Sequence, residues 1–97
     1  MLHIINKSPY DRPALDSAIQ SGEGAILFTE DGVYAIAKGG TAEAKIKAAF
    51  GKFKFYALGP DINARGLSDR VMENISVVDY NGFVDLVAEY KTNQSWL

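Results

Sequence analysis

The stretch Lys54-Phe-Tyr-Ala-Leu-Gly-Pro-Asp-Ile-Asn-Ala-Arg-Gly66 predicts a buried strand that runs directly into a helix. Residues 55–58 are all apolar, which favours a strand covered on both faces of a parallel sheet. Pro60 suits the first helical turn, Asp61 lies near the positive helix end, and Gly66 can close the helix in the left-handed conformation. Ligands usually bind beyond the carboxyl ends of such strands, so this turn is the first place to look for a site.

The rest of the chain alternates between the same two kinds of element. Further strands are predicted at residues 2–6, 25–29 and 75–78, and helices at residues 11–21, 41–51 and 79–90. Asp11, Thr41 and Asp79 are the expected N-caps of these helices. This alternation indicates a three-layer α/β sandwich with a mostly parallel sheet, built as a single domain over residues 1–97.

Three local assignments depend on apolar spacing. Residues 33–37 follow Asp31-Gly32, which is typical of a hairpin turn, so they form either a returning antiparallel strand or a short helix. Phe53 continues the apolar face of the helix at 41–51. The buried face of the last helix is expected to consist of Phe83, Val84, Val87 and Tyr90.

Composition excludes several classes of function. The 97 residues contain no cysteine, which rules out disulfides, thiolate metal sites and thiol nucleophiles supplied by this chain. Ten basic against twelve acidic residues give a net charge of −2, which argues against direct nucleic-acid binding. Apolar runs are too short to cross a bilayer and the start of the chain does not resemble a signal peptide, so we expect a cytoplasmic protein without membrane contact.

Few residues suggest catalysis or ligand binding. Gly39-Gly40-Thr41 is the nearest approach to a phosphate-binding loop, but helix capping explains it better. His3 is the single histidine and is expected to be a packed strand residue, because the chain offers it no zinc-binding partners. Glu30 and Asp31 are better explained by an exposed turn than by an acid pair. We therefore predict no cofactor, no metal and no catalytic residue.

Two aromatic residues are candidates for an interface. Trp96 is the single tryptophan and lies next to the last residue, so it either folds back onto its own sheet or inserts into a neighbouring protein. Tyr34, with Val33 and Ile36, either contributes to an apolar surface patch or packs in the core.

A series of short motifs runs along the whole chain. They are Leu2-His3, Asn6-Lys-Ser-Pro9, Glu30-Asp-Gly-Val-Tyr34, Ala57-Leu-Gly-Pro-Asp61, Ala64-Arg-Gly66, Val78-Asp-Tyr80, Phe83-Val84 and Ser95-Trp-Leu97. By their order and spacing, the chain resembles the TusB/DsrH family. The resemblance implies a DsrE-like three-layer fold with a four- to five-stranded sheet, in which residues 94–97 add a short edge strand. It also implies a short helix, rather than a hairpin strand, at residues 32–37.

The resemblance further implies a role in sulfur transfer. The assemblies TusBCD and DsrEFH pair two copies each of three related subunits and pass persulfide sulfur along a relay. The first serves 2-thiouridine formation at the tRNA wobble position, and the second serves reverse dissimilatory sulfur oxidation. The implied partners are therefore a DsrE/TusD-like and a DsrF/TusC-like subunit in a hetero-oligomer. The Gly-Pro-Asp turn and the Ser-Trp-Leu ending look slightly more like DsrH.

Both cysteine positions of the family are occupied by other residues here. The DsrE/TusD subunit carries its sulfur on a cysteine near a strand-to-helix turn that resembles residues 59–61, where this chain has Asp61. DsrH-like members often have another cysteine at the position that aligns with Ala18. The expected function is thus that of a non-catalytic, structural subunit. Tyr34, Asp61, Trp96 and Leu97 are the residues expected at its interface.

A second hypothesis comes from another class of protein. A self-associating, flavodoxin-like module could bind a nucleotide or small anion at the strand ends and form a homo-oligomer when isolated. A stand-alone enzyme ranks below both, because no base, nucleophile and stabilising group can be grouped from the sequence.

Overall fold

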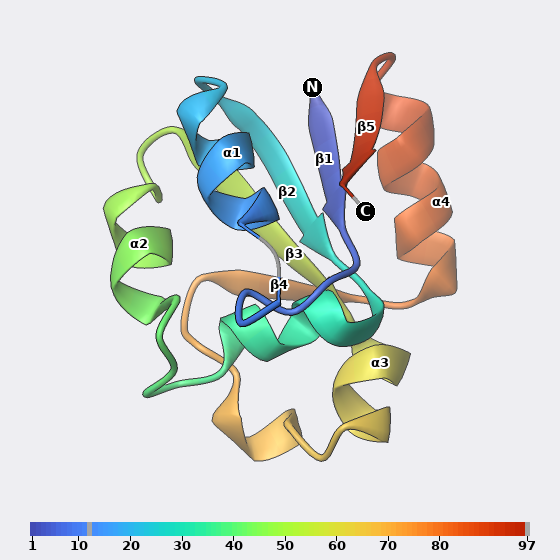
Figure 1. Cartoon of the computed structure of the whole chain (residues 1–97). Helices are drawn as coiled ribbons and strands as arrows, with labels where there is room; N and C mark the ends of the chain where they lie inside the picture. The colour runs from blue at the N-terminus through green and yellow to red at the C-terminus, as the bar shows by residue number, and fades with distance from the viewer. Residues whose placement is uncertain (12, 97) are drawn as a thin grey trace.

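Five parallel strands form one sheet in the order β4-β3-β2-β1-β5 (Figure 1). The computed structural model describes residues 1–11 and 13–96. The strands are β1 Leu2–Ile5, β2 Gly24–Phe28, β3 Phe53–Leu58, β4 Ile75–Val78 and β5 Asn93–Trp96. The sheet is thus entirely parallel, and the edge strand expected at residues 94–97 is confirmed for residues 94–96, which belong to β5 next to β1.

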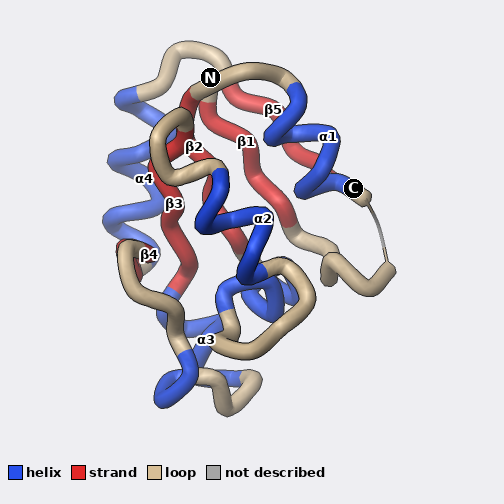
Figure 2. The backbone as a smooth tube through the Cα atoms, turned by 90° about the vertical axis from the view of Figure 1, so that its left-hand side faces the viewer, coloured by secondary structure: helices blue, strands red, loops and turns tan. Residues whose placement is uncertain are grey.

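Helices cover both faces of this sheet. They are α1 Ala14–Gln20, α2 Glu43–Ala48, α3 Gly59–Ala64 and α4 Tyr80–Glu89, with the short 3₁₀ helices η1 Glu30–Ile36 and η2 Ser68–Arg70. The first three crossovers step in one direction along the sheet and the last one returns, which places α4 on the face opposite α1 and α2 (Figures 1 and 2). The three-layer α/β sandwich is therefore confirmed.

The core is divided by the sheet into two parts. Along β2, Ile26 and Phe28 point to the larger cluster under α1, α2 and η1, while Ala25 and Leu27 point to the smaller one under α4. The rings of Phe28 and Phe55 stack with their centroids 6.2 Å apart in the larger cluster. Residues 25–28 are completely buried because β2 lies at the centre of the sheet, which explains their unbroken apolar run.

The segment after β2 is a 3₁₀ helix and not a hairpin strand. Gly32 explains this path, because a Cβ there would lie 2.1 Å from the carbonyl oxygen of Ile5. Because it has no side chain, Gly32 allows η1 to lie close to the end of β1. It does not form the hairpin turn that Asp31-Gly32 suggests. The short helix implied by the family resemblance is confirmed, in 3₁₀ form.

Other expectations about local structure need correction. Phe53 belongs to β3, where it pairs with Gly24, and not to the preceding helix. Helix α1 begins after Pro13 rather than Asp11, and α2 begins after Ala42 rather than Thr41. The cap at Asp79 is confirmed, since its Oδ1 accepts a hydrogen bond from the Gly82 N–H at 2.8 Å.

Helix α4 buries a narrower face than its apolar residues suggest. Val84 is 63% exposed, whereas Leu86 is buried against the sheet. Phe83, Leu86, Val87 and Tyr90 follow the spacing of three and four residues that one helix face requires, and Val84 lies outside that stripe. The prediction that Val84 belongs to the buried face of this helix is therefore wrong.

Candidate functional site

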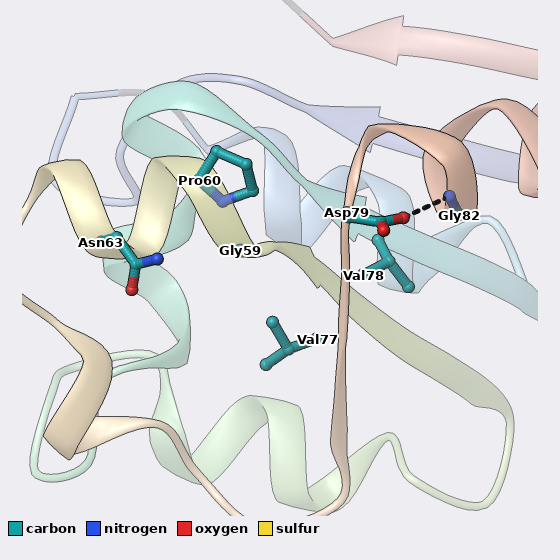
Figure 3. A pocket seen from close by; sticks show the side chains of 7 residues that line it. All are labelled: Gly59, Pro60, Asn63, Val77, Val78, Asp79 and Gly82. Atoms are coloured by element: carbon teal, nitrogen blue, oxygen red, sulfur yellow. Dashed lines mark hydrogen bonds between the residues drawn. The ribbon is translucent and has the colours of Figure 1, made fainter.

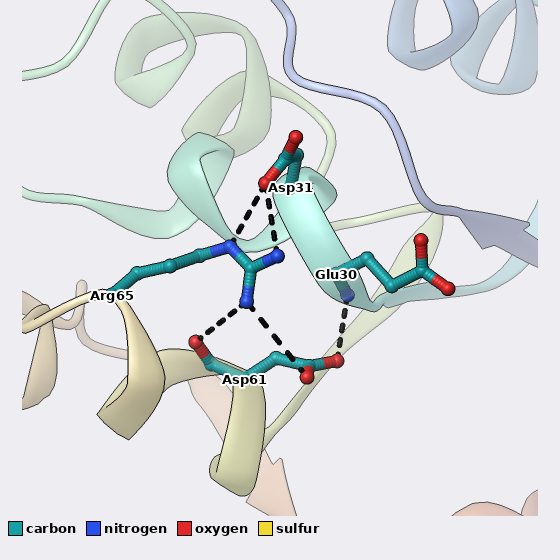
Figure 4. A network of polar contacts seen from close by, with 4 residues as sticks. All are labelled: Glu30, Asp31, Asp61 and Arg65. Carbon is teal, nitrogen blue, oxygen red and sulfur yellow. Dashed lines mark hydrogen bonds and ion pairs between the residues drawn. The ribbon is translucent and has the colours of Figure 1, made fainter.

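The carboxyl ends of the strands carry a polar network that links α3 to η1. Asp61 Oδ2 accepts a hydrogen bond from the Glu30 backbone N–H at 2.6 Å. Arg65 Nε and Nη2 lie 3.0 and 2.9 Å from Asp31 Oδ1, and Arg65 Nη1 lies 3.8 Å from Asp61 Oδ1 (Figure 4). Asp61 and Arg65, one turn apart, thus form an ion pair, and this pair is extended by contacts across more than thirty residues of sequence.

Glu30 has an unusual backbone in this network. Its φ angle is +49°, in the left-handed region that residues other than glycine rarely adopt. The 2.6 Å hydrogen bond from its N–H to Asp61 holds the backbone of Glu30 in this conformation. Strained backbone of this kind concentrates at functional sites, so the strand ends are the candidate region of the molecule.

One cleft lies between the ends of β3 and β4 and has a volume of about 590 Å³. It is lined by Gly59, Pro60, Asn63, Val77, Val78, Asp79 and Gly82 (Figure 3). The cleft forms because the chain leaves β3 toward one face of the sheet and leaves β4 toward the other. Its single carboxylate, Asp79, is engaged in capping α4, so this lining offers no base paired with a nucleophile.

A second cleft of about 490 Å³ lies between α4 and the ends of the central strands. Its lining comes from the ends of β1, β2, β3 and β5 and from the first turns of η1, α3 and α4: Ile4, Asn6, Thr29, Glu30, Leu58, Asp61, Tyr80, Phe83 and Ser95. Glu30 and Asp61 supply its charged groups, and no lysine or arginine is among these residues. The lining therefore combines an apolar wall with several hydrogen-bond acceptors.

The indole of Trp96 folds back onto its own sheet. Its Nε1–H donates a hydrogen bond to His3 Nδ1 at 3.1 Å, and His3 Nε2 lies 3.1 Å from the hydroxyl oxygen of Ser21. Burial, together with the positive charge of the N-terminus, lowers the pKa of His3 below its ordinary value. His3 is thus a packed strand residue, as expected, and the indole of Trp96 packs against its own sheet, while its place in a subunit interface stays a prediction.

The other predicted residues lie in different places. Tyr34 is 38% exposed on η1, which contacts α3, the helix that carries Asp61. Ala18 lies on the buried face of α1 and is completely buried in the larger core cluster. Leu97 lies outside the described residues. Asp61 and Tyr34 therefore belong to neighbouring elements, while Trp96 lies on the edge strand β5.

Several residues of the second cleft were not predicted as site residues from the sequence. Asn6, Tyr80 and Phe83 come from separate segments that only the parallel topology brings together. The pair Glu30-Asp31 directly after a buried strand was the available hint. Within residues 1–11 and 13–96, no three His, Cys, Asp or Glu residues are grouped to hold a metal, and no helix is long and apolar enough to span a membrane.

Comparisons with known proteins agree with this architecture. Protein MTH1491 from Methanobacterium thermoautotrophicum, a protein of unknown function, has a solved structure that superposes with a TM-score of 0.78. The superposition covers 98% of this chain and 96% of that one at 16% sequence identity. The two proteins thus share one fold.

Sequence comparisons identify relatives with higher sequence identity than this structural neighbour. The family model described as DsrH-like protein matches residues 7–93. Protein TusB from Pectobacterium parmentieri is 34% identical over 98 residues, covering 99% of this chain and all of the relative. Protein TusB from Escherichia coli O1:K1 / APEC gives the same identity and coverage. With a family model matching most of its length and relatives this similar, the chain belongs to the TusB/DsrH family.

Proposed function

We propose that this chain is an accessory subunit of a sulfur-relay complex and that it carries no sulfur itself. The observation behind this proposal is family membership combined with a complete lack of cysteine. Persulfide storage requires a thiol, so the chain must act by shaping the assembly. Its proposed partners are one DsrE/TusD-like and one DsrF/TusC-like subunit.

The turn at residues 59–61 supports an architectural role. A carrier cysteine at such a turn has to be accessible to its donor and acceptor. Asp61 instead directs its carboxylate to the Glu30 N–H and to Arg65, and its side chain is 18% exposed. The side chain at this turn therefore fixes α3 against η1.

Relatives named TusB favour the tRNA route within this proposal. At 34% identity over the whole chain, they outweigh the slight likeness of the Gly-Pro-Asp turn and the Ser-Trp-Leu ending to DsrH. We therefore propose a role in 2-thiolation of the wobble uridine of tRNA, with dissimilatory sulfur oxidation as the second route.

Purification from the source cell tests the proposal directly. Native mass spectrometry of the tagged chain should find two related subunits bound to it. Deletion of its gene should remove 2-thiouridine from hydrolysed tRNA, and the wild-type chain should restore it. A chain that always purifies without related subunits would refute the proposal. Intact 2-thiouridine together with a defect in sulfur oxidation would select the second route.

The alternative is a self-associating module that binds a nucleotide or small anion in the cleft between β3 and β4. The position of that cleft, where strand connections diverge, is the observation that favours it. Its lining contains Asp79 and no basic residue, which disfavours an anion. Thermal unfolding with a panel of nucleotides and inorganic phosphate decides the matter, because a bound ligand raises the melting temperature by mass action. A flat response across the panel would exclude this alternative.

A further inference from the structure

The cleft between α4 and the strand ends has an apolar wall with acceptors at its rim. Ile4, Leu58 and Phe83 form the wall, and Glu30 contributes a carboxylate. The volume of about 490 Å³ falls in the range of pockets that hold a side chain or small ligand. An occupant would therefore need an apolar stem and a donor-rich end.

Glu30 presents a carboxylate that is not neutralised within the described part of the chain. Arg65, the nearest cation of the network, is engaged with Asp31 and Asp61. Figure 4 shows the Glu30 carboxylate directed away from Arg65, while its backbone is held at φ +49° by the hydrogen bond to Asp61. The rigid backbone thus carries an unpaired negative charge at the rim of the cleft.

The entrance of the cleft is suited to a protein partner. Tyr80 lines the cleft and is 62% exposed, and Val84, one turn further along α4, is 63% exposed. Exposed aromatic and apolar side chains beside a pocket are characteristic of the centre of a protein interface, where arginine is enriched. A partner covering these residues would place a side chain into the cleft.

We propose that this cleft receives an arginine side chain of a partner subunit. Its aliphatic stem would pack on Ile4, Leu58 and Phe83, and its guanidinium would bind the Glu30 carboxylate. Arginine suits the cleft better than lysine because its planar fork pairs with a carboxylate through two hydrogen bonds and stacks on aromatic rings such as Tyr80. The identity of the partner as a related relay subunit rests on the proposed function.

Titration of the isolated chain with blocked arginine tests the cleft itself. Nα-acetyl-arginine methylamide should cause saturable NMR shifts in amides of residues 4–6, 29–31, 58–61 and 80–83. The Glu30→Gln variant should bind it at least about tenfold more weakly, whereas Glu23→Gln, an exposed residue outside the cleft, should bind it normally. The matching citrulline derivative, a neutral isostere, should cause no shift.

Three outcomes would overturn the inference. The first is the absence of saturable shifts at the cleft. The second is an affinity of Glu30→Gln for blocked arginine equal to that of wild type. The third is equal affinity of wild type for blocked lysine and blocked arginine, which would refute the assignment to arginine. Circular dichroism on both variants checks that they are folded.

Purification of the complex separates this inference from the proposed function. Glu30→Lys should lose most of the related subunits that wild type retains, and Glu23→Lys should keep them. Full retention by Glu30→Lys would refute the docking site and leave the proposed function standing. A wild-type chain without related subunits would refute the proposed function, and the blocked-arginine titration would then still decide whether the cleft binds a guanidinium.

Discussion

The indole N–H of Trp96 donates a hydrogen bond to Nδ1 of His3 at 3.1 Å and so joins β5 to β1. Because Nδ1 accepts, the proton of the neutral imidazole is on Nε2, which can donate to the Ser21 oxygen. The Ser21 hydroxyl in turn donates to the carbonyl oxygen of Ala18 at 2.6 Å. Each polar hydrogen in this chain of contacts has one acceptor, provided that His3 is neutral.

Acidification should therefore weaken the fold through His3. Its pKa is lowered in the folded protein by burial and by the N-terminal charge, relative to an ordinary value of 6.5. The unfolded chain then binds more protons below that value, so stability is fully present above it and is lost as the pH falls through the folded pKa. Urea unfolding between about pH 7 and pH 5 should show decreasing stability, above the range where most carboxylates titrate.

The His3→Gln variant is the control for this pH dependence. Its stability should vary less over the same range, because glutamine does not titrate. An identical slope in the two proteins would show that another group is responsible.

Replacing Trp96 by phenylalanine should destabilise the protein by about 1–2 kcal/mol, because His3 Nδ1 would remain buried without a donor. Chemical unfolding followed by far-UV circular dichroism gives the value. Tyr10→Phe is the matched control, since Tyr10 is 67% exposed and its replacement should change stability by less than about 0.5 kcal/mol. Equal stabilities of the two variants would contradict the anchoring role of the indole.

Gly32→Ala should be among the most damaging single substitutions in the chain. A Cβ at 2.1 Å from the Ile5 carbonyl oxygen forces η1 away from β1, at an expected cost of about 3 kcal/mol or more. Gly51→Ala is the control, because nothing lies within 4 Å of the added methyl group. Comparison of soluble yield and melting temperature measures the difference, and a well-folded Gly32→Ala protein would show that η1 has room to move.

Asp61→Ala should cost about 1–3 kcal/mol through the loss of an acceptor for the Glu30 N–H and of the charge beside Arg65. Asp61→Asn keeps an acceptor and should cost less. Hydrogen exchange at the Glu30 amide should rise in the alanine variant ahead of global unfolding. Unchanged protection of that amide would mean that its 2.6 Å contact contributes little.

Much of the fold follows from local patterns in the sequence. The apolar run of β3, the proline at the start of α3 and the cap at Asp79 are local signals, and each led to the correct element. The 3₁₀ helix after β2 does not follow from residues alone, because Asp31-Gly32 locally favours a hairpin. The contact between Gly32 and Ile5, which are distant in sequence, overrides this local preference for a hairpin.

The candidate site was less accessible to such reasoning. The spacing of four between Asp61 and Arg65 is compatible with their pairing, but nothing in the sequence indicates that Asp61 holds the amide of Glu30, 31 residues away. The expected burial of Val84 failed for a related reason, since the set of α4 residues that face the sheet depends on how the helix is seated.

The pairing of β1 with β5 has a kinetic consequence. Leu2 lies opposite Asn93, so this contact closes a loop that contains nearly every other element of the fold. Closure of such a long loop is entropically costly and contributes little until the intervening strands are in place. We expect β5 to dock after β1, β2 and β3 have paired, so that β1 passes through folding as an edge strand with His3 uncovered until Trp96 arrives.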